Sequence, residues 1–323
     1  MAARIHPLSG SQELVELRRL GASDLDPLLE EETAAWSAEL QWDFRKSAEL
    51  VRRFVEMRAL EGAALVEDGK VLGYAYYVVE DSKALIGDLY VRSEARNTAR
   101  ENALMARIIE SLSDLPAVAR VEAQLMMLGF DADRTLPLGA YSSGFERKFM
   151  RLALSRAQLE APPASRPFYV EHWSDFYQEA VAQAIAESYE GHVDSLINDQ
   201  YRTPHGARRF LQNIIQYPGC GTFFRPASFL AFDGVSGRLC GISLASMVAH
   251  ESGHVTQICV TPGVRGKGVG RNLLNRTLIA LRQAGCRSAS LTCTSANRRA
   301  VALYEQVGFT TTKRFAAFVW DFK

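Results

Sequence analysis

The pattern of apolar and polar residues is clearest in the second half of the chain. Residues 255–260 alternate in polarity and are rich in β-branched side chains, which predicts a strand. Farther on, Leu273, Leu274, Leu278 and Leu281 recur at helical spacing and Gly285 follows as a stop, so this stretch is predicted to be a helix. The glycines at 266, 268 and 270 therefore lie at a strand-to-helix turn.

Similar patterns predict elements in both halves. Residues 11–62 are predicted to be helical, with an amphipathic helix over 47–60. A hairpin over 63–80 turns at Asp68-Gly69, and a strand over 84–91, a helix over 100–112 and a strand over 120–126 follow. The second half is predicted to contain a helix over 174–188, a hairpin over 229–248, a strand over 288–293, a helix ending near Val307 and a last strand over 316–322.

The order of elements is the same in both halves, which predicts an internal repeat. When Val91 is laid on Val260, Arg96 falls on Arg265, Ala99 on Gly268 and Glu101 on Gly270. Ala140 stands where Tyr304 would be, and Pro137 interrupts the corresponding helix. We therefore expect a degenerate domain without a cofactor over 1–154, a proline-rich linker over 155–167 and a working domain over 168–323.

The glycine-rich turn has the features of a phosphate site. Glycine allows positive φ and lets a ligand approach the main chain, while the N–H groups at a helix N-terminus attract an anion. Arg265 and Lys267 add positive charge. A P-loop would need Ser or Thr after Lys267, where Gly268 stands, and the dinucleotide spacing Gly-x-Gly-x-x-Gly fails from either possible start.

What remains is Arg265-x-x-Gly268-x-Gly270, which resembles the pyrophosphate loop of the GCN5-related N-acetyltransferases (the GNAT superfamily). Asn297, Ala300, Tyr304 and Gly308-Phe309 resemble the later motif of the same superfamily. The resemblance covers roughly residues 168–323. It implies an α/β fold with a mixed sheet (α+β), built from two tandem domains. Each domain would be a central mixed, largely antiparallel sheet with a splayed strand pair, flanked by helices.

The resemblance also implies roles for individual residues. Asn297 would contact the cofactor, and Tyr304 would stand beside the sulfur as the general acid; the alternative for Tyr304 is a core tyrosine of an amphipathic helix. An N–H of Ile258 or Cys259 would meet the thioester carbonyl. The expected cofactor-binding residues are Ile258, Cys259, Val260, Arg265, Gly266, Lys267, Gly268, Val269, Gly270, Arg271, Asn297 and Tyr304.

A general base would remove the proton of an ammonium acceptor. His254 is the first candidate, because it starts the predicted strand where superfamily members often carry Glu or His. Glu251 and His250 are the next candidates. The alternative for His254 is a half-exposed histidine at a strand end.

Composition excludes several classes of function. Lys+Arg and Asp+Glu number 37 each, which gives no support to binding of nucleic acid or an anionic membrane. No run of 18 apolar residues predicts a membrane span, the first residues lack the apolar stretch of a signal peptide, and the five cysteines follow no metal-binding pattern. We therefore expect a cytoplasmic monomer or homodimer without a metal.

The leading functional prediction is transfer of an acetyl group from acetyl-CoA to a primary amine, by direct attack, in the C-terminal domain. The acceptor would be a small molecule or a peptide, held near the lip at residues 187–194 with Asp199 and Tyr201. Two alternatives stay open. The tandem arrangement resembles mycothiol synthase, which acetylates an aminosugar–cysteine conjugate, and a non-catalytic acyl-CoA sensor or scaffold would bind the cofactor without transfer.

Overall fold

A computed structural model describes residues 12–160, 167–217 and 219–322, which fall into two compact units. Unit 1 comprises residues 1–147 and 314–323, and unit 2 comprises residues 148–313. This division differs from the expected one, because residues 148–154 lie in unit 2 and the last ten residues lie in unit 1. Part of the expected linker, residues 161–166, lies outside the described residues.

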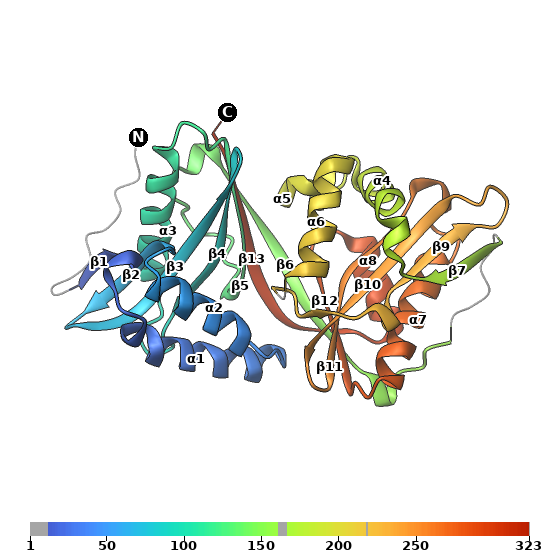
Figure 1. The fold of residues 1–323 in the computed structure, drawn as a ribbon, viewed down its shortest axis with the longest axis horizontal. Helices are drawn as coiled ribbons and strands as arrows, with labels where there is room; N and C mark the ends of the chain where they lie inside the picture. The colour runs from blue at the N-terminus through green and yellow to red at the C-terminus, as the bar shows by residue number, and fades with distance from the viewer. Residues whose placement is uncertain (1–11, 161–166, 218, 323) are drawn as a thin grey trace. The chain divides into compact units, whose positions relative to one another are not determined.

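Unit 1 is a sheet with helices on both faces (Figure 1). Its elements are β1 (Gln12–Glu16), α1 (Ala22–Leu40), α2 (Arg45–Glu56), β2 (Glu61–Glu67), β3 (Lys70–Glu80), β4 (Lys83–Val91), α3 (Thr98–Ser113), β5 (Arg120–Gly129) and the first part of β6 (Ser142–Ala153). The helix predicted from residue 11 is wrong for Gln12–Glu16, which pairs antiparallel with β2. The strand order is β1-β2-β3-β4-β5-β13, where β13 (Thr310–Asp321) comes from the end of the chain.

Unit 2 repeats this plan. Its elements are β7 (Phe168–His172), α4 (Gln178–Tyr189), α5 (Asp194–Ile197), α6 (Pro204–Gln216), β8 (Thr222–Phe223), β9 (Phe229–Asp233), β10 (Leu239–Ala249), β11 (Ser252–Val260), α7 (Val269–Gln283), β12 (Ser288–Thr294) and α8 (Arg298–Val307). The strand order is β6-β12-β11-β10-β9-β7, and β8 pairs with β10.

Alternation along β9 shows which helices cover which face of the unit 2 sheet. Leu230 and Phe232 pack in one cluster with the buried residues of α4 and α6, whereas Phe229 and Ala231 pack in another with Val269 and Leu273 of α7. Successive strand residues point to opposite faces, so α4 and α6 lie on one side of the sheet and α7 on the other (Figure 1).

Each unit contains one parallel strand pair that separates part-way along. In unit 2, β11 and β12 pair only from Ser252–Val255 with Ser288–Leu291, so the rest of β11 leaves its neighbour. In unit 1, β4 and β5 pair only from Lys83–Ile86 with Arg120–Ala123. The predicted splayed pair is therefore confirmed in both units.

A β-bulge at matching positions supports the internal repeat. In β11, Gln257 pairs with Leu244 and Val255 pairs with Ala245, which leaves Thr256 as the extra residue. In β4, Asp88 pairs with Tyr76 and Ile86 with Tyr77, which leaves Gly87. The alignment of Val91 on Val260 places Gly87 on Thr256, so both copies bend their splayed strand at the same point.

Two strands cross from one unit to the other. Within β6, Ser142–Arg147 belong to unit 1 and Lys148–Ala153 to unit 2, and within β13 the crossing lies between Lys313 and Arg314. In unit 1, β13 pairs with β5 from Phe315 to Asp321. Its Ala316, Phe318 and Trp320 are buried in the unit 1 core beside residues of α3, so unit 1 depends on the last residues of the chain.

Unit 1 also buries two carboxyl groups that face each other. Glu32 of α1 is fully buried and accepts hydrogen bonds from the Tyr74 hydroxyl at 2.8 Å and from the Trp36 indole N–H at 3.2 Å. Burial raises the pKa of Asp88 on β4 to about 6, and burial together with the Asp88 charge raises the pKa of Glu32 well above its usual range. The protonated forms therefore favour the folded state.

We predict that Asp88→Asn stabilises unit 1 relative to the wild type as the pH rises from 4 to 7. A carboxyl whose folded pKa exceeds its unfolded pKa loses its stabilising effect as the pH rises through the folded pKa, here about 6. Urea denaturation is followed by tryptophan fluorescence in a Trp173→Phe background, so that the signal comes from Trp36, Trp42 and Trp320 of unit 1. The exposed control Asp133→Asn should keep the wild-type profile, and a parallel profile for Asp88→Asn would contradict the prediction.

Candidate active site

The turn between β11 and α7 takes its shape from two glycines. After β11, the Thr261 N–H donates to the Cys240 carbonyl at 3.0 Å, and a short 3-10 helix spans Pro262–Val264. Gly266 then has a φ of 77°, and Gly268, the N-cap of α7, has a φ of 86°. These left-handed conformations are open to glycine at little cost, so the sequence motif is required by the backbone itself.

The N-terminus of α7 presents unpaired N–H groups. Asn272 makes the first bond within the helix, from its N–H to the Gly268 carbonyl at 3.0 Å. The N–H groups of Val269, Gly270 and Arg271 come before it, so the helix supplies them with no carbonyl. A helix N-terminus with free donors and a positive dipole end is suited to a phosphate group.

Two arginines extend the positive charge beside this turn. A Cβ added to Gly266 would lie 3.0 Å from Nη2 of Arg299 on α8, so the guanidinium group stands directly over the loop backbone. The Nε of Arg271 is buried and has no hydrogen-bond partner in the described structure. This arrangement fits a diphosphate ligand. It combines backbone N–H donors, the Arg299 guanidinium group close to Gly266, and the unpaired Nε of Arg271.

Arg265 and Lys267 have structural contacts of their own. The Arg265 guanidinium group donates to the Ser188 carbonyl in the last turn of α4, where a cation also complements the helix dipole. The Lys267 ammonium group donates to the Gly263 carbonyl at 2.8 Å. Arg265 therefore ties the glycine turn to the helix on the other face of the sheet.

The predicted thioester-binding stretch of β11 lies along the separated part of the strand. Ile258, Cys259 and Val260 pair with Ser243, Ile242 and Gly241 of β10, while their other edge has no partner in β12. The bulged residue is Thr256, two positions before Ile258. Burial raises the pKa of the Cys259 thiol to about 11, which keeps it protonated at neutral pH.

The later motif shapes α8. Asn297 is the N-cap, and its Oδ1 accepts the Ala300 N–H at 3.2 Å. Tyr304 is 7% exposed, and its ring meets the edge of Phe309 at a centroid distance of 6.1 Å. Gly308, with a φ of 107°, ends the helix and donates its N–H to the Tyr304 carbonyl at 3.1 Å.

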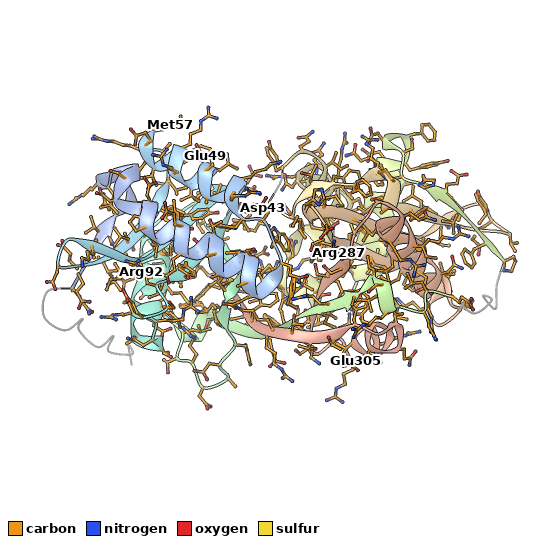
Figure 2. All side chains as sticks on the ribbon, turned by 90° about the horizontal axis from the view of Figure 1, so that it is seen from below. Asp43, Glu49, Met57, Arg92, Arg287 and Glu305 are labelled. Carbon is orange, nitrogen blue, oxygen red and sulfur yellow. The ribbon has the colours of Figure 1, made fainter. Side chains whose placement is uncertain are left out.

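The three candidate bases lie at the opposite end of β11 from the glycine turn. His254 is buried in the paired part of the strand, where its Nδ1 lies 2.9 Å from the Ser290 Oγ and its ring stacks on Phe149. Burial lowers the pKa of His254 to about 3, so the imidazole is a weak proton acceptor. Glu251 forms an ion pair at 3.0 Å with Arg287, which is labelled in Figure 2.

A chain of contacts that the sequence did not predict joins β11, the end of α4 and the N-cap of α8. Gln257 of β11 donates to the Tyr189 hydroxyl at 2.9 Å, the Tyr189 ring meets the His192 ring edge-on at 5.2 Å, and His192 Nε2 lies 3.2 Å from the Asn297 amide nitrogen. In the sequence, Tyr189 and His192 belong to the expected acceptor lip and Asn297 to the later motif. Their mutual contacts join residues up to 105 positions apart, so no local pattern indicated them.

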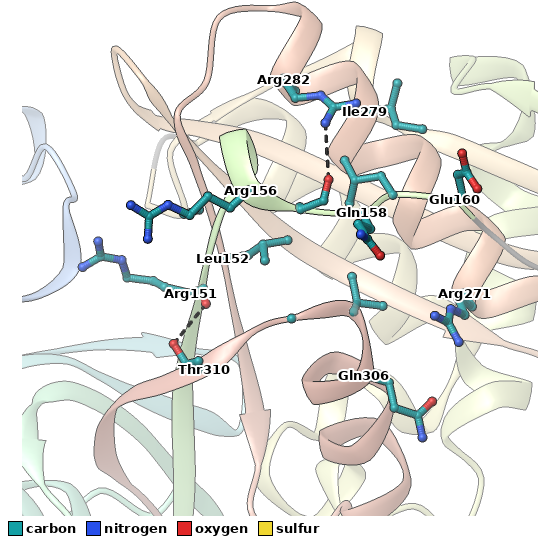
Figure 3. Close-up of a pocket in the computed structure, with 15 residues that line it drawn as sticks. Arg151, Leu152, Arg156, Gln158, Glu160, Arg271, Ile279, Arg282, Gln306 and Thr310 are labelled. Atoms are coloured by element: carbon teal, nitrogen blue, oxygen red, sulfur yellow. Dashed lines mark hydrogen bonds between the residues drawn. The ribbon is translucent and has the colours of Figure 1, made fainter.

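A cavity of about 1120 Å³ runs along α7 and the end of α8 (Figure 3). Arg271, Ile279 and Arg282 line it from α7, and Arg282 donates to the Ala157 carbonyl at 3.5 Å. Its other wall includes Arg151 and Arg156. Arg271 thus connects this basic cavity to the N-terminus of α7.

Comparison with known proteins agrees with this geometry. Residues 179–309 match the acetyltransferase (GNAT) family. Over 125 residues the chain is 32% identical to the N-alpha-acetyltransferase MAK3 of Arabidopsis thaliana, and over 91 residues it is 33% identical to the mycothiol acetyltransferase of Propionibacterium freudenreichii. These matches cover 38% and 27% of this chain, and 61% and 29% of those relatives.

Solved structures extend the likeness to both units. A GCN5-related N-acetyltransferase from Sphaerobacter thermophilus superposes with a TM-score of 0.66 at 18% identity, covering 98% of each chain. A tandem GNAT protein from the clavulanic acid biosynthesis pathway superposes with a TM-score of 0.60 at 16% identity, covering 97% of this chain and 99% of its own. At these identities the likeness shows the fold alone.

The turn of unit 1 that corresponds to the GNAT loop is closed by its own side chains. Asn97 caps α3 by accepting the Arg100 N–H at 2.9 Å, and Ala99 lies inside the helix. Glu101, 6% exposed, binds Arg134 at 2.6 Å in the first helical turn. Arg96 donates to the Val91 carbonyl at 3.1 Å. A carboxylate in unit 1 therefore lies at the position that aligns with Gly270 of unit 2.

None of the helices in the described residues is long and apolar enough to cross a membrane. Within the same residues, no group of three or more His, Cys, Asp or Glu side chains is arranged to hold a metal ion.

We predict that Gly268→Ala lowers the free energy of unfolding of unit 2 by about 1–2 kcal/mol, because an alanine at that φ is held in a left-handed conformation. Gly270→Ala is the matched control. Gly270 has no positive φ, and a Cβ there would lie 3.6 Å from a Val260 methyl group, in ordinary contact. Equal stability of the two variants in urea denaturation would contradict the strain at Gly268.

We predict that one acetyl-CoA binds per chain. The glycine turn of unit 2 has free N–H groups, whereas the corresponding turn of unit 1 holds the Asn97 cap and the Glu101–Arg134 pair. Isothermal titration calorimetry should give a stoichiometry near one, and Gly268→Glu should remove the binding, because its carboxylate repels the diphosphate. Two acetyl-CoA molecules per chain would show that unit 1 also binds.

Proposed function

We propose that unit 2 is an acetyl-CoA-dependent N-acetyltransferase that acetylates a primary amine. The observation that carries the proposal is the glycine turn, which presents the free N–H groups of α7 beside the separated strands β11 and β12. The diphosphate would bind the N–H groups of Val269, Gly270 and Arg271 with the help of Arg299. The pantetheine arm would lie along Ile258–Val260, and the family match over residues 179–309 supports the assignment.

In this proposal the amine nitrogen attacks the thioester carbon, and Tyr304 gives a proton to the departing thiolate. Tyr304 comes from the same helix that Asn297 caps, and its burial limits competition by water. On the acceptor side, Tyr189 and Tyr201 stack at a centroid distance of 4.4 Å and form an aromatic wall. Such a wall suits the alkyl part of an amine, and its cation once protonated.

Two acceptor classes follow from the relatives. MAK3 is named as an N-alpha-acetyltransferase, which favours a peptide N-terminus, and the mycothiol acetyltransferase match favours an aminosugar–cysteine conjugate as the second candidate. None of the five cysteines forms a disulfide in the described structure, which supports a reducing location such as the cytoplasm. A non-catalytic acyl-CoA sensor would also use the glycine turn, but would have no use for an acid at position 304.

We predict that the protein releases CoA thiol from acetyl-CoA in the presence of one amine from a panel of peptides, aminosugar–cysteine conjugates and polyamines. Tyr304→Phe should lower kcat by roughly 10²–10⁴-fold while acetyl-CoA affinity stays within a few-fold, because the hydroxyl acts on the leaving group. Thiol release with Ellman's reagent and calorimetry with acetyl-CoA measure the two quantities. Acetyl-CoA binding without turnover on any amine would favour the sensor.

A further inference from the structure

Arg265 begins the glycine motif, but its side chain leaves the turn. Its guanidinium Nη2 donates a hydrogen bond to the Ser188 carbonyl in the last turn of α4. The α4 helix lies on one face of the unit 2 sheet, whereas α7, with its free N–H groups, lies on the other (Figure 1). The guanidinium group is therefore directed to the α4 side of the sheet, opposite to the helix that would receive the diphosphate.

The C-terminal end of α4 depends on this partner from outside the helix. The last carbonyl groups of a helix have no N–H partner within it, and the last turn of α4 contains no basic residue. The Tyr189 carbonyl accepts the His192 N–H at 3.1 Å, and the Ser188 carbonyl accepts the Arg265 guanidinium group. Ser188 is 3% exposed, so water is a poor substitute for the guanidinium donor. Arg265 thus satisfies a buried acceptor and also complements the negative end of the helix dipole.

The residue after Ser188 belongs to the aromatic wall of the acceptor side. The Tyr189 ring stacks on Tyr201 at a centroid distance of 4.4 Å. The Tyr189 hydroxyl accepts a hydrogen bond from the Gln257 amide of β11 at 2.9 Å. This tyrosine is therefore held at two points. Gln257 fixes the hydroxyl, and Arg265 fixes the backbone one residue away.

A different arginine is placed to meet the diphosphate. A Cβ added to Gly266 would lie 3.0 Å from Nη2 of Arg299 on α8. The α8 helix packs with α7 in one core cluster, which includes Val301 of α8 and Leu278 of α7. Arg299 therefore approaches the turn from the side of the free N–H groups, and Arg265 extends from the turn to the side of the acceptor wall.

We propose that Arg265 is a positioning residue for the amine acceptor, which holds the end of α4 and thereby the Tyr189–Tyr201 wall. This inference rests on the proposed function of unit 2. It changes the role that the motif gives to this residue, because the sequence places Arg265 among the cofactor-binding residues. The Arg265 side chain then contributes to binding of the acceptor and little to binding of acetyl-CoA.

The first test needs no acceptor. Hydrogen–deuterium exchange of the full-length protein, measured by mass spectrometry, reports how firmly residues 186–202 are held. In Arg265→Met, which keeps an aliphatic stem but removes the donors, these residues should exchange faster than in the wild type. Arg276→Gln is the control, because Arg276 is an exposed arginine of α7 that donates to Asn272 of the same helix. It should keep the wild-type exchange, and unchanged exchange in Arg265→Met would overturn the inference.

The second test compares the two arginines in calorimetric titration with acetyl-CoA. Arg265→Met should keep the affinity within a few-fold of the wild type. Arg299→Met should lower it by roughly ten- to hundredfold, because it removes a charge-assisted hydrogen bond to the diphosphate. Equal losses in the two variants would show that Arg265 also binds the diphosphate and would overturn the inference. A wild type that does not bind acetyl-CoA would count against the proposed function instead.

The third test uses steady-state kinetics with the amine that the wild type acetylates. Arg265→Met should raise KM for the amine by roughly ten- to hundredfold, while kcat and KM for acetyl-CoA stay within a few-fold, because the wall binds the acceptor without taking part in the chemical step. Arg265→Lys keeps a cation and a donor, so its KM should lie between those of Arg265→Met and the wild type. If Arg265→Met does not fold, the same rise is measured on Arg265→Lys.

Two kinetic results would contradict the positioning role. One is an unchanged KM for the amine in both Arg265 variants, and the other is a rise confined to KM for acetyl-CoA. Arg276→Gln should keep both KM values. Absence of wild-type turnover with every amine would count against the proposed function, whereas the exchange and calorimetric results would still decide the role of Arg265.

Discussion

The early end of pairing between β11 and β12 is the constraint on which the rest of unit 2 depends. Four residue pairs join the two strands, and beyond Val255 each strand follows its own course. The separated edge of β11 leaves backbone groups that a ligand can pair with, and the end of β12 leads to the N-cap of α8. These two diverging strand ends position the glycine turn, Asn297, Tyr304 and His192.

Unit 1 has the same sheet geometry as unit 2 but different contacts at the corresponding turn. It keeps the separated strands and the bulge at the equivalent residue, yet Asn97 and Glu101 close the turn from within. Where β11 carries Gln257 in contact with Tyr189, β4 carries Asp88 beside the buried Glu32. The strand geometry is thus common to both units, whereas the side chains at the polar ends of the strands differ.

Local sequence patterns predicted much of the fold and of the candidate site, but they could not predict contacts between residues far apart in the chain. The glycine spacing predicted the turn, because Gly266 and Gly268 require positive φ, and the Asn297 motif predicted a helix that starts and ends where α8 does. His254 was chosen from its place in the strand, but burial depends on Phe149 and Ser290, which are far away in sequence. His192 and the crossing of β13 depend on partners more than 100 residues apart, which no local periodicity can reveal.

The crossing strand has a consequence for how the chain is made. Ribosomes synthesise residues from the N-terminus, so the partner of β5 emerges about 180 residues after β5 itself, once unit 2 has been translated. Until then, the edge of β5 and the apolar pocket for Phe318 and Trp320 stay open in a nascent chain. The exposed strand edge can pair with the wrong partner during that interval. The N-terminal half of the sequence therefore comes first on the ribosome but completes its fold last.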